Sequence, residues 1–323
     1  MFNGISIIIT NYNGFCLTEK LIESIYDCKF IKDYNYEIII CDDCSHNNDV
    51  DLLKKKFKDC IIIVNNKNQG NALSHINAVN YANYDILWFL DNDVIIKNIN
   101  FSSIFNELSK NNVFAINPQI LRPSMNLRNE SISAYIFKNG RIQSENIGLH
   151  KNIEFKEKIK IAWATSCCMF VLKKKYFETG GFDSIYAPQY LEDNDLCYNA
   201  MKLGYDNIYL PDSAVYHYAN TTMKKMYDEN NLIHIDARNR FLFFWKNIDS
   251  LDLWIKHFFF ILQIFIKYDK KNIRAFLAAL KRIHKIRRLK RTQQNSDIKI
   301  LDRFENNKLL DMLPENIKNI YKL

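Results

Sequence analysis

The stretch of sequence that decides the fold reads Ile86-Leu87-Trp88-Phe89-Leu90-Asp91-Asn92-Asp93. Five consecutive large apolar residues predict a strand that is buried on both faces, and two acids follow it directly. Two carboxylates two residues apart at a strand end can bind one hard cation that also binds phosphate oxygens. Acids at strand ends are also common in solvated turns, so Asp91 and Asp93 alone leave both interpretations open.

Similar apolar runs precede this strand, and each is followed by polar residues. Strands are predicted at Gly4–Thr10, Tyr36–Cys41 and Cys60–Asn65, with helices at Leu17–Asp27, Asp49–Phe57 and Gly70–Ala82. Near-continuous apolar strands separated by helices indicate a parallel sheet that is covered on both faces. Ligands of such sheets bind beyond the carboxyl ends of the strands. We therefore expect the polar residues after the strands to meet at one rim.

The remainder of the chain divides into two parts. Residues 113–165 contain short strands and loops that the pattern does not order. Met169–Leu172 reads as a buried strand, and Glu192–Leu203 as a helix that Gly204 closes. From about Met223 the pattern is helical. We expect one α/β domain over residues 1–222 and a helical, basic region over residues 223–323.

Composition narrows the class of protein. The 323 residues are 48% hydrophobic and 14% aromatic, which predicts a sizeable core and excludes global disorder. Eight Gly and five Pro are too few for a loop-rich all-β sandwich. We expect the eight cysteines to be reduced thiols of a cytosolic protein and no signal peptide before the first strand. A redox or zinc site at Cys41 and Cys44 is the competing interpretation of that pair.

The positive charge of the chain is concentrated near its C-terminus. The net charge is +8, and residues 267–291 hold eleven Lys or Arg and one acid. The apolar run Leu251–Ile266 precedes them and is too short and too charged to span a bilayer. Together the two blocks predict an interfacial anchor on anionic lipid at the inner face of the cell membrane. A helix packed on the rest of the protein is the alternative, and no nucleic-acid binding is expected.

Two further clusters contain residues suited to chemistry. Asp42-Asp43 follows the second strand, where an Asp commonly holds ribose hydroxyls, although an Asx turn or a helix cap is the alternative. Glu192, Asp193 and Asp195 begin a predicted helix, where helix capping alone would explain them. His217 lies in an apolar strand, where most histidines are structural. With the acids, however, it would complete a set that offers a general base and a metal ligand.

In this order, the motifs resemble glycosyltransferase family 2, and within it the bacterial rhamnosyltransferase-like branch. The resembling segments are Ser6–Asn13, Asp42-Asp43, Asn68-Gln69-Gly70 with Asn77, Leu90–Asp93, Gly180–Asp183, Glu192–Asp195, and Gly204 with Pro211 leading to His217. They span roughly residues 4–220. The resemblance implies an α/β protein of the GT-A type, with a mostly parallel nucleotide-binding sheet flanked by helices and a helical C-terminal extension.

The resemblance also implies a function and the residues that perform it. An inverting, metal-assisted enzyme would transfer a sugar from a UDP-, TDP- or GDP-linked donor to a hydroxyl of a surface glycan or lipid-linked oligosaccharide. Asp93, Asp91 and His217 would bind Mn²⁺ or Mg²⁺, and Asp193 would be the general base. The resemblance assigns nucleotide binding to Thr10, Asn11, Tyr12, Asp42, Asn68, Gly70 and Asp91, and acceptor binding to Glu192, Trp163 and Arg238.

Departures from the family pattern and rival functions complete the prediction. Ser166-Cys167-Cys168 stands where the family usually has a small Gly-Ala-like pair, and His75 stands where a basic residue is frequent. A sugar nucleotidyltransferase should carry a Gly-rich basic loop after the first strand, but Thr10–Gly14 contains one Gly and no Lys or Arg. A non-catalytic nucleotide-sugar-binding scaffold is the second alternative. The donor sugar, the acceptor and the oligomeric state stay open.

Overall fold

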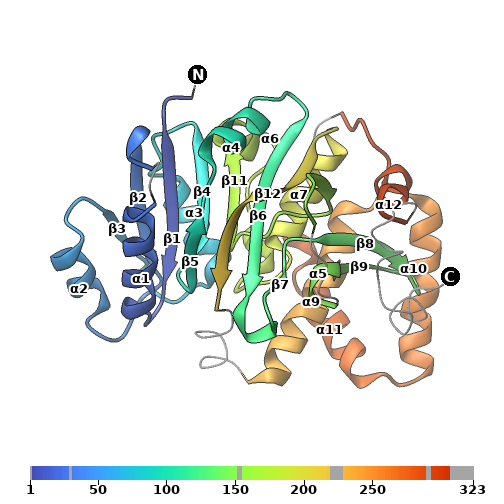
Figure 1. Ribbon diagram of the computed structural model, residues 1–323. Helices are drawn as coiled ribbons and strands as arrows, with labels where there is room; N and C mark the ends of the chain where they lie inside the picture. The colour runs from blue at the N-terminus through green and yellow to red at the C-terminus, as the bar shows by residue number, and fades with distance from the viewer. Residues whose placement is uncertain (1, 29–30, 151–154, 219–227, 289–291, 306–323) are drawn as a thin grey trace.

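The computed structural model describes residues 2–28, 31–150, 155–218, 228–288 and 292–305 (Figure 1). The strands are β1 (Ile5–Asn11), β2 (Tyr36–Asp42), β3 (Ile61–Val64), β4 (Ile86–Asp91), β5 (Val94–Asn98), β6 (Val113–Arg122), β7 (Arg128–Asn129), β8 (Ser133–Lys138), β9 (Arg141–Asn146), β10 (Ile159–Ile161), β11 (Cys168–Leu172) and β12 (Asp206–His217). The helices are α1 (Phe15–Tyr26), α2 (Asp49–Lys56), α3 (Asn71–Val79), α4 (Phe101–Leu108), α5 (Ile147–His150), α6 (Lys173–Glu178), α7 (Glu192–Lys202), α9 (Glu229–Asn247), α10 (Leu251–Ile266), α11 (Lys270–Leu280) and α12 (Asp297–Glu305).

A ten-stranded sheet forms the centre of the molecule, with the order β10-β12-β6-β11-β4-β1-β2-β3 along its main path. Strands β3, β2, β1 and β4 pair in parallel, which confirms the parallel arrangement predicted for the N-terminal part. Strand β11 runs antiparallel to both β4 and β6 and joins them to the second half of the sheet. Strands β6 and β12 pair in parallel. The sheet is therefore mixed: β11 separates two sets of parallel strands, and β10, β5 and β7 add antiparallel pairs at its second half.

Helices cover both faces of the sheet, as the apolar strands predict. Along β1, Ile8 packs into a core with α3, α7 and α9, whereas Ile7 and Ile9 pack into a second core with α1, α2 and α4. The same alternation continues on β4, where Phe89 faces the first core and Trp88 the second. Because side chains alternate across a strand, continuous apolar strands need a cover on each face. The carboxyl ends of the parallel strands stay open for a site.

The region 113–165, which the sequence pattern does not order, contains a central strand and a separate hairpin. Strand β6 lies inside the sheet, and its partner β12 begins at Asp206, opposite Val113. Strands β8 and β9 form a two-stranded antiparallel sheet of their own. The hairpin packs against α9 and α12 and extends the first core towards the C-terminal helices. Short strands with distant partners explain why local patterns did not order this region.

The helical C-terminal region predicted from the sequence is present as α9 to α12 (Figure 1). The predicted boundary at residues 222 and 223 lies outside the described residues. Among the described helices, none is both long and apolar enough to cross a membrane. Helix α10 stands at the edge of the molecule farthest from α2, beyond the hairpin of β8 and β9 (Figure 1). The fold therefore places the parallel strands at one end and the apolar run of the tail at the other.

Candidate active site

The polar residues after β1, β2 and β4 meet at one rim, as predicted. The sheet register places Thr10 opposite Asp91 and Asn11 opposite Asp42. Asn11 Nδ2 donates to Asp42 Oδ2 at 2.7 Å. Thr10 Oγ1 donates to Asn71 Oδ1 at 2.6 Å, and Asn71 Nδ2 donates to Asp91 Oδ1 at 3.2 Å. Parallel strands bring these groups together because all their carboxyl ends lie at the same edge.

The two acids after β2 have different surroundings. Asp42 is fully buried, and its carboxylate accepts hydrogen bonds from the Ser45 hydroxyl at 2.6 Å and from the Ser45 backbone at 2.8 Å. Asp43 accepts backbone N–H groups of Gln69 at 2.9 Å and of Gly70 at 2.7 Å. Asp43 thus fixes the loop before α3, a role that the sequence interpretation missed. The sequence signal for this role was the pair Asp42-Asp43, of which the resemblance assigned a nucleotide-binding role to Asp42 only.

The other predicted nucleotide-binding residues surround this rim. Tyr12 is half-buried, and its ring meets His46 edge-on at 6.0 Å. Asn68 Nδ2 is buried and has no hydrogen-bond partner among the described residues. Gly70 has φ +88°, and a Cβ there would lie 2.2 Å from the Pro188 carbonyl oxygen. Glycine is needed at this position because the loop before α3 touches the segment before α7.

The predicted metal ligands lie together at the end of β4 and β12. Ligand atoms of Asp91, Asp93 and His217 all lie within 4.8 Å of one another. His217 Nε2 is 3.2 Å from Asp93 Oδ1. Strand β5 pairs with β12 so that Val94 is opposite His217, which explains how Asp93 and His217, far apart in sequence, meet. Two carboxylates and one imidazole are a donor set that suits Mn²⁺ and, with more oxygen ligands, Mg²⁺.

Burial and mutual repulsion set the charge of this cluster. Burial, and then the charge of Asp93, raise the pKa of Asp91 to about 6. Burial lowers the pKa of His217, but its interactions with Cys167, Asp93 and Glu130 outweigh burial and hold the pKa well above its ordinary value. A divalent cation would relieve the repulsion between the two carboxylates, so the electrostatics fit a cation at this place.

Glu130 supports His217 from the side away from Asp93, and the sequence interpretation missed it. Its Oε2 lies 2.8 Å from His217 Nδ1 and 2.7 Å from Arg122 Nε. Burial raises the pKa of Glu130, but the hydrogen bond and the charge of His217, followed by the charge of Arg122, lower it overall. A carboxylate on Nδ1 orients the imidazole and leaves Nε2 directed at the acids. Glu130 lies within residues 113–165, where the sequence pattern does not predict the order of strands and loops, and it is far from any motif.

Cys167 offers a rival ligand set with Glu130 and His217. Burial raises the pKa of Cys167 to about 11, so the group is a neutral thiol near neutrality. Thiolates, not thiols, bind metals. The set formed by Asp91, Asp93 and His217 is therefore the better cation site at neutral pH. The pair Cys41 and Cys44 does not belong to a metal-ligand cluster within the described residues.

The predicted base lies in the first turn of α7. Asp193 Oδ1 accepts hydrogen bonds from the Asn194 backbone at 2.7 Å and from Asn194 Nδ2 at 3.0 Å. Burial raises the pKa of Asp193, while hydrogen bonds from Asn194, Ser166 and Thr165 lower it in part. The loop before β11 therefore reaches the carboxylate. A carboxylate with a raised pKa is a better proton acceptor near neutrality.

Glu192, the neighbour of Asp193, is more strongly perturbed. Burial, and then the charge of Asp193, raise the pKa of Glu192 to about 8, and Asp91 adds to the shift. Its Oε2 is buried and has no hydrogen-bond partner among the described residues. The loop before β11 joins the acids of α7 to those after β4, because its Ser166 backbone hydrogen-bonds Asp193 and its Cys167 carbonyl accepts the Asp91 backbone N–H at 3.1 Å. Strongly perturbed acids in a cluster of this kind are typical of functional sites.

The two remaining predicted acceptor residues are buried against the protein. Trp163 is 6% exposed; its backbone N–H donates to the Ser133 hydroxyl at 3.1 Å, and its ring lies 5.6 Å from Tyr135. Arg238, on α9, is 7% exposed and donates to the Ala187 carbonyl at 2.9 Å. The guanidinium therefore holds the segment before α7. Arg238 thus lies beside the segment whose Pro188 touches Gly70 at the rim.

His75 lies on α3, where the family often has a basic residue, and is uncharged. Burial lowers its pKa to about 3, and its ring packs 5.2 Å from Phe89 and 5.5 Å from Phe182. Neither ring nitrogen has a hydrogen-bond partner among the described residues. His75 therefore supplies no positive charge for a diphosphate, as its departure from the family pattern suggested.

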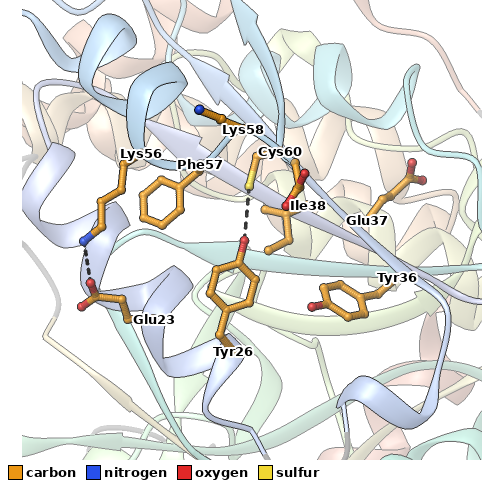
Figure 2. A pocket seen from close by; sticks show the side chains of 10 residues that line it. Glu23, Tyr26, Tyr36, Glu37, Ile38, Lys56, Phe57, Lys58 and Cys60 are labelled. Carbon is orange, nitrogen blue, oxygen red and sulfur yellow. Dashed lines mark hydrogen bonds and ion pairs between the residues drawn. The ribbon is translucent and has the colours of Figure 1, made fainter.

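A pocket of about 580 Å³ lies at the other edge of the sheet, where β2 and β3 begin (Figure 2). Tyr26, Tyr36 and Cys60 line it, and Lys56 at its rim pairs with Glu23 at 2.6 Å. Burial raises the pKa of Cys60 to about 11, so its thiol is not activated. None of the predicted site residues lines this pocket. The rim at the carboxyl ends of β1, β2 and β4 is therefore a better candidate for the active site than this pocket.

Residues 6–180, more than half of the chain, match the sequence profile named Glycosyl transferase family 2. The chain belongs to glycosyl transferase family 2. This membership confirms the predicted family and the predicted enzyme class, a glycosyltransferase. No curated protein sequence matches this family 2 member.

Solved structures with the same fold support the GT-A architecture. GalNAc-T7 with UDP, GalNAc and Mn²⁺ aligns with a TM-score of 0.60 at 13% identity, over 76% of this chain and 48% of that one. S. aureus TarS 1-349 in complex with UDP-GlcNAc aligns with a TM-score of 0.54 at 15% identity, over 88% of this chain and 83% of that one. The mannosyltransferase PcManGT from Pyrobaculum calidifontis with GDP-Man and Mn²⁺ aligns with a TM-score of 0.50 at 13% identity, over 88% and 75%. This family 2 chain thus spans about half the length of GalNAc-T7.

Proposed function

We propose that this protein is an inverting glycosyltransferase that moves a sugar from a nucleoside-diphosphate sugar to a hydroxyl of a surface glycan or lipid-linked oligosaccharide. One observation carries the proposal. The cluster of Asp91, Asp93 and His217 lies at the carboxyl-end rim, and the loop at Ser166 and Cys167 joins it to the acids that begin α7. A cation site beside a base is the minimum that metal-assisted transfer to a hydroxyl requires.

In this proposal Asp93, Asp91 and His217 hold Mn²⁺ or Mg²⁺. The cation would neutralise the charge that grows on the departing diphosphate. The chain's own residues orient the ligands: Glu130 holds His217 by Nδ1, and Asn71 holds Asp91. Structures of GalNAc-T7 and PcManGT contain Mn²⁺, which supports a divalent cation here.

The donor would bind along the rim formed by the strand ends. Asn11 and Asp42 are joined by a hydrogen bond of 2.7 Å and offer a fixed polar surface to a nucleoside. Asn68 has a buried Nδ2 that lacks a partner among the described residues, so a ligand oxygen would satisfy it. We assign Thr10, Tyr12, Gly70 and Asp91 to the same binding surface. Neighbours bind UDP, UDP-GlcNAc and GDP-Man, and the rhamnosyltransferase-like resemblance adds TDP-rhamnose to the candidates.

Asp193 would take the proton from the acceptor hydroxyl as it attacks the anomeric carbon from the face opposite the diphosphate. Its carboxylate is held by Asn194 and by the loop at Thr165 and Ser166. Glu192, protonated near neutrality, would donate a hydrogen bond to the acceptor. Trp163 and Arg238 would support the acceptor side from buried positions.

The same proposal assigns catalysis to residues 1–222 and membrane association to residues 223–323. We place the protein at the inner face of the cell membrane, as a peripheral protein without nucleic-acid partners. The apolar helix α10 and the basic residues after it support this location.

Titration calorimetry with UDP, TDP and GDP, each with Mn²⁺ and then with EDTA, tests the donor site. We expect one nucleotide to bind only in the presence of the metal. Asp93→Asn should remove this metal-dependent binding. Asp193→Asn should leave nucleotide binding within about three-fold but reduce transfer by at least about 10². Folded protein that binds none of the three nucleotides would refute the proposal. Loss of nucleotide binding in Asp193→Asn would refute only the assignment of the base.

A further inference from the structure

Exposed apolar side chains gather on one part of the surface. Eleven of the nineteen large apolar residues that are exposed in the described structure lie between residues 251 and 283. They are Leu251, Ile255, Phe258, Phe259, Leu262, Phe265, Ile266, Tyr268, Leu277, Leu280 and Ile283. Scattered apolar residues are normal on protein surfaces, but a concentration of this kind marks an interaction site. We call these eleven residues the apolar face.

Helix α10 is apolar on two opposite sides. Leu253, His257, Phe260 and Ile264 are buried and pack on α9 and the β8–β9 hairpin. The exposed residues fall at the complementary positions of the 3.6-residue repeat and form a stripe on the other side. Phe259 is 62% exposed and Ile266 is 83% exposed. The inner side explains why α10 is folded, but it does not explain the outer stripe.

Helix α11 continues the apolar face at the end of α10. The Phe265 ring meets the Phe276 ring edge-on at 5.6 Å, which fixes α11 against α10. Leu277 and Leu280 of α11 are exposed, whereas Ala275 and Ala279 are buried. Small buried residues allow α11 to lie close to its neighbours while its larger side chains point outward.

Positive charge borders the apolar face on the side of α11, whereas the start of α10 carries Asp252, an exposed acid that pairs with Lys256 at 2.9 Å. The bordering basic residues are Lys267, Lys270, Lys271, Arg274, Lys281 and Lys285. The one acid in this stretch, Asp269, caps α11 through the Asn272 backbone at 3.1 Å and the Asn272 side chain at 2.6 Å. An apolar stripe bordered by Lys and Arg is the pattern of a helix that lies in a membrane interface.

A groove extends the apolar face towards α9. Trp245, Trp254, Ile261, Ile283 and Ile286 line it, with Arg288 at one end, and its volume is about 480 Å³. Trp254 donates its indole N–H to the Ile248 carbonyl at 2.8 Å, so the ring is fixed with its polar edge satisfied. Tryptophan in this arrangement is typical of the membrane interface, where one edge is apolar and the other polar.

We propose that the apolar face of α10 and α11 docks on an anionic lipid bilayer, with α10 lying parallel to the membrane surface. The inference rests on the membrane role proposed for residues 223–323 and names the surface that performs it. The combination of the apolar stripe with the positive charge along α11 favours a bilayer with acidic headgroups over a protein partner. No described helix can span the membrane, so the contact is interfacial.

The docking surface is connected to the active site through fixed contacts. Arg282, just after α11, donates to the Ile185 carbonyl at 2.7 Å and to the Ala187 carbonyl at 3.0 Å. The following residue, Pro188, lies against Gly70 at the nucleotide rim. The membrane therefore sets the orientation of the rim, and a lipid-linked acceptor would approach it at a defined height.

Co-sedimentation of the full chain with vesicles tests the proposal. Vesicles are made of phosphatidylcholine alone or of phosphatidylcholine mixed with phosphatidylglycerol. We expect binding to the acidic vesicles, and a reduction of at least about ten-fold in Phe258→Ser/Phe259→Ser/Ile266→Ser. Lys267→Glu/Lys270→Glu/Lys281→Glu should reduce binding to acidic vesicles by at least about 10², because each lost basic residue near the surface costs about five-fold and each new Glu adds repulsion. The matched control, Tyr81→Ser/Phe177→Ser, removes exposed aromatic residues elsewhere and should bind like wild type.

Thermal unfolding and Mn²⁺-dependent nucleotide binding are measured on the same preparations. A folded serine variant that binds nucleotide but not vesicles supports the docking surface. Vesicle binding without nucleotide binding in wild type would support the surface and refute the proposed reaction. Wild type that stays in the supernatant with both vesicle types refutes the surface. Equal vesicle binding by wild type and the serine variant also refutes it. A wild-type protein that forms a dimer and does not bind vesicles, with a monomeric serine variant, refutes it as well.

Discussion

Glu192 and Asp193 share one helical turn, yet their carboxyl groups have different hydrogen-bond partners. Glu192 has a buried oxygen without a partner among the described residues, whereas Asp193 accepts two hydrogen bonds from Asn194. Hydrogen bonds favour the charged form of a carboxyl group and burial favours the neutral form. Burial raises the pKa of both groups, and the hydrogen bonds at Asp193 oppose that rise in part, so Asp193 is the better proton acceptor and Glu192 the better donor.

A comparison of wild type with Glu192→Gln tests whether Glu192 is protonated near neutrality, because protonation makes the unfolding free energy depend on pH. Unfolded Glu titrates near 4.5 and folded Glu192 near 8, so its stabilising contribution is complete below pH 4.5 and is lost as pH rises to 8. Between pH 5 and pH 8 in EDTA, wild type should lose on the order of 2–4 kcal/mol of unfolding free energy relative to Glu192→Gln. Urea unfolding at several pH values measures the difference. The control is Glu157→Gln, in an exposed loop, and parallel curves for wild type and Glu192→Gln would contradict the assignment.

At the scale of elements, α10 joins the hairpin of β8 and β9 to α9 through a buried histidine. His257 Nδ1 donates to the Gly140 carbonyl at 2.7 Å, and its Nε2 accepts the Trp245 indole N–H at 3.1 Å. The ring stacks on Phe244 at 3.9 Å. Both nitrogens are used in the neutral form, so a second proton on Nε2 would oppose the Trp245 N–H. Burial accordingly lowers the pKa of His257 to about 4.

The packing of α10 should therefore weaken in acid. Unfolded His titrates near 6.5, so the contribution of His257 is complete above pH 6.5 and is lost as pH falls to about 4. His257→Gln keeps one donor and one acceptor but does not titrate. Over this range wild type should lose about 3 kcal/mol relative to His257→Gln. Thermal melts across this pH range measure the loss. The control variant His284→Gln, at an exposed site, should show the same pH dependence as wild type. The same pH dependence in His257→Gln would contradict the role of His257.

At the scale of the whole molecule, α9 connects the active site to the C-terminal helices. Asn239 Nδ2 donates to the carbonyls of Tyr186, Gln189 and Tyr190 at 2.8–2.9 Å. Its Oδ1 accepts from Arg238 at 2.7 Å. One buried amide therefore holds residues 186–190, the segment that lies against Gly70 and leads into α7.

Asn239→Ala should destabilise the protein and loosen its nucleotide rim together. Removal of the amide leaves three carbonyls and a buried guanidinium without this partner, so we expect a loss of about 3–5 kcal/mol in unfolding free energy. Urea unfolding and nucleotide affinity are measured side by side. Asn231→Ala on the exposed start of the same helix removes a bond to Asp228 and should cost less than about 1 kcal/mol. Equal effects of the two changes would exclude the proposed role of Asn239.

Prediction from the sequence succeeded where local patterns determine structure. The strands that end at Asn11, Asp42 and Asp91 were predictable, because an apolar run followed by polar residues marks both a buried strand and its open end. Glu130 was not, because its position beside His217 depends on the pairing of β6 with β12. The resemblance assigned Trp163 and Arg238 to the acceptor, and only the tertiary structure shows that both are buried.

The attachment of α9 to the segment before α7 has a consequence for how this protein can be divided. Residues 1–222 contain every proposed metal ligand and the proposed base, but they lack Asn239, which ties down the segment beside them. A shortened gene that ends after β12 would encode the reacting groups without the amide that keeps them in place. Recombination between relatives would meet the same limit. The smallest portion that can be inherited or expressed as a working enzyme should therefore extend through α9.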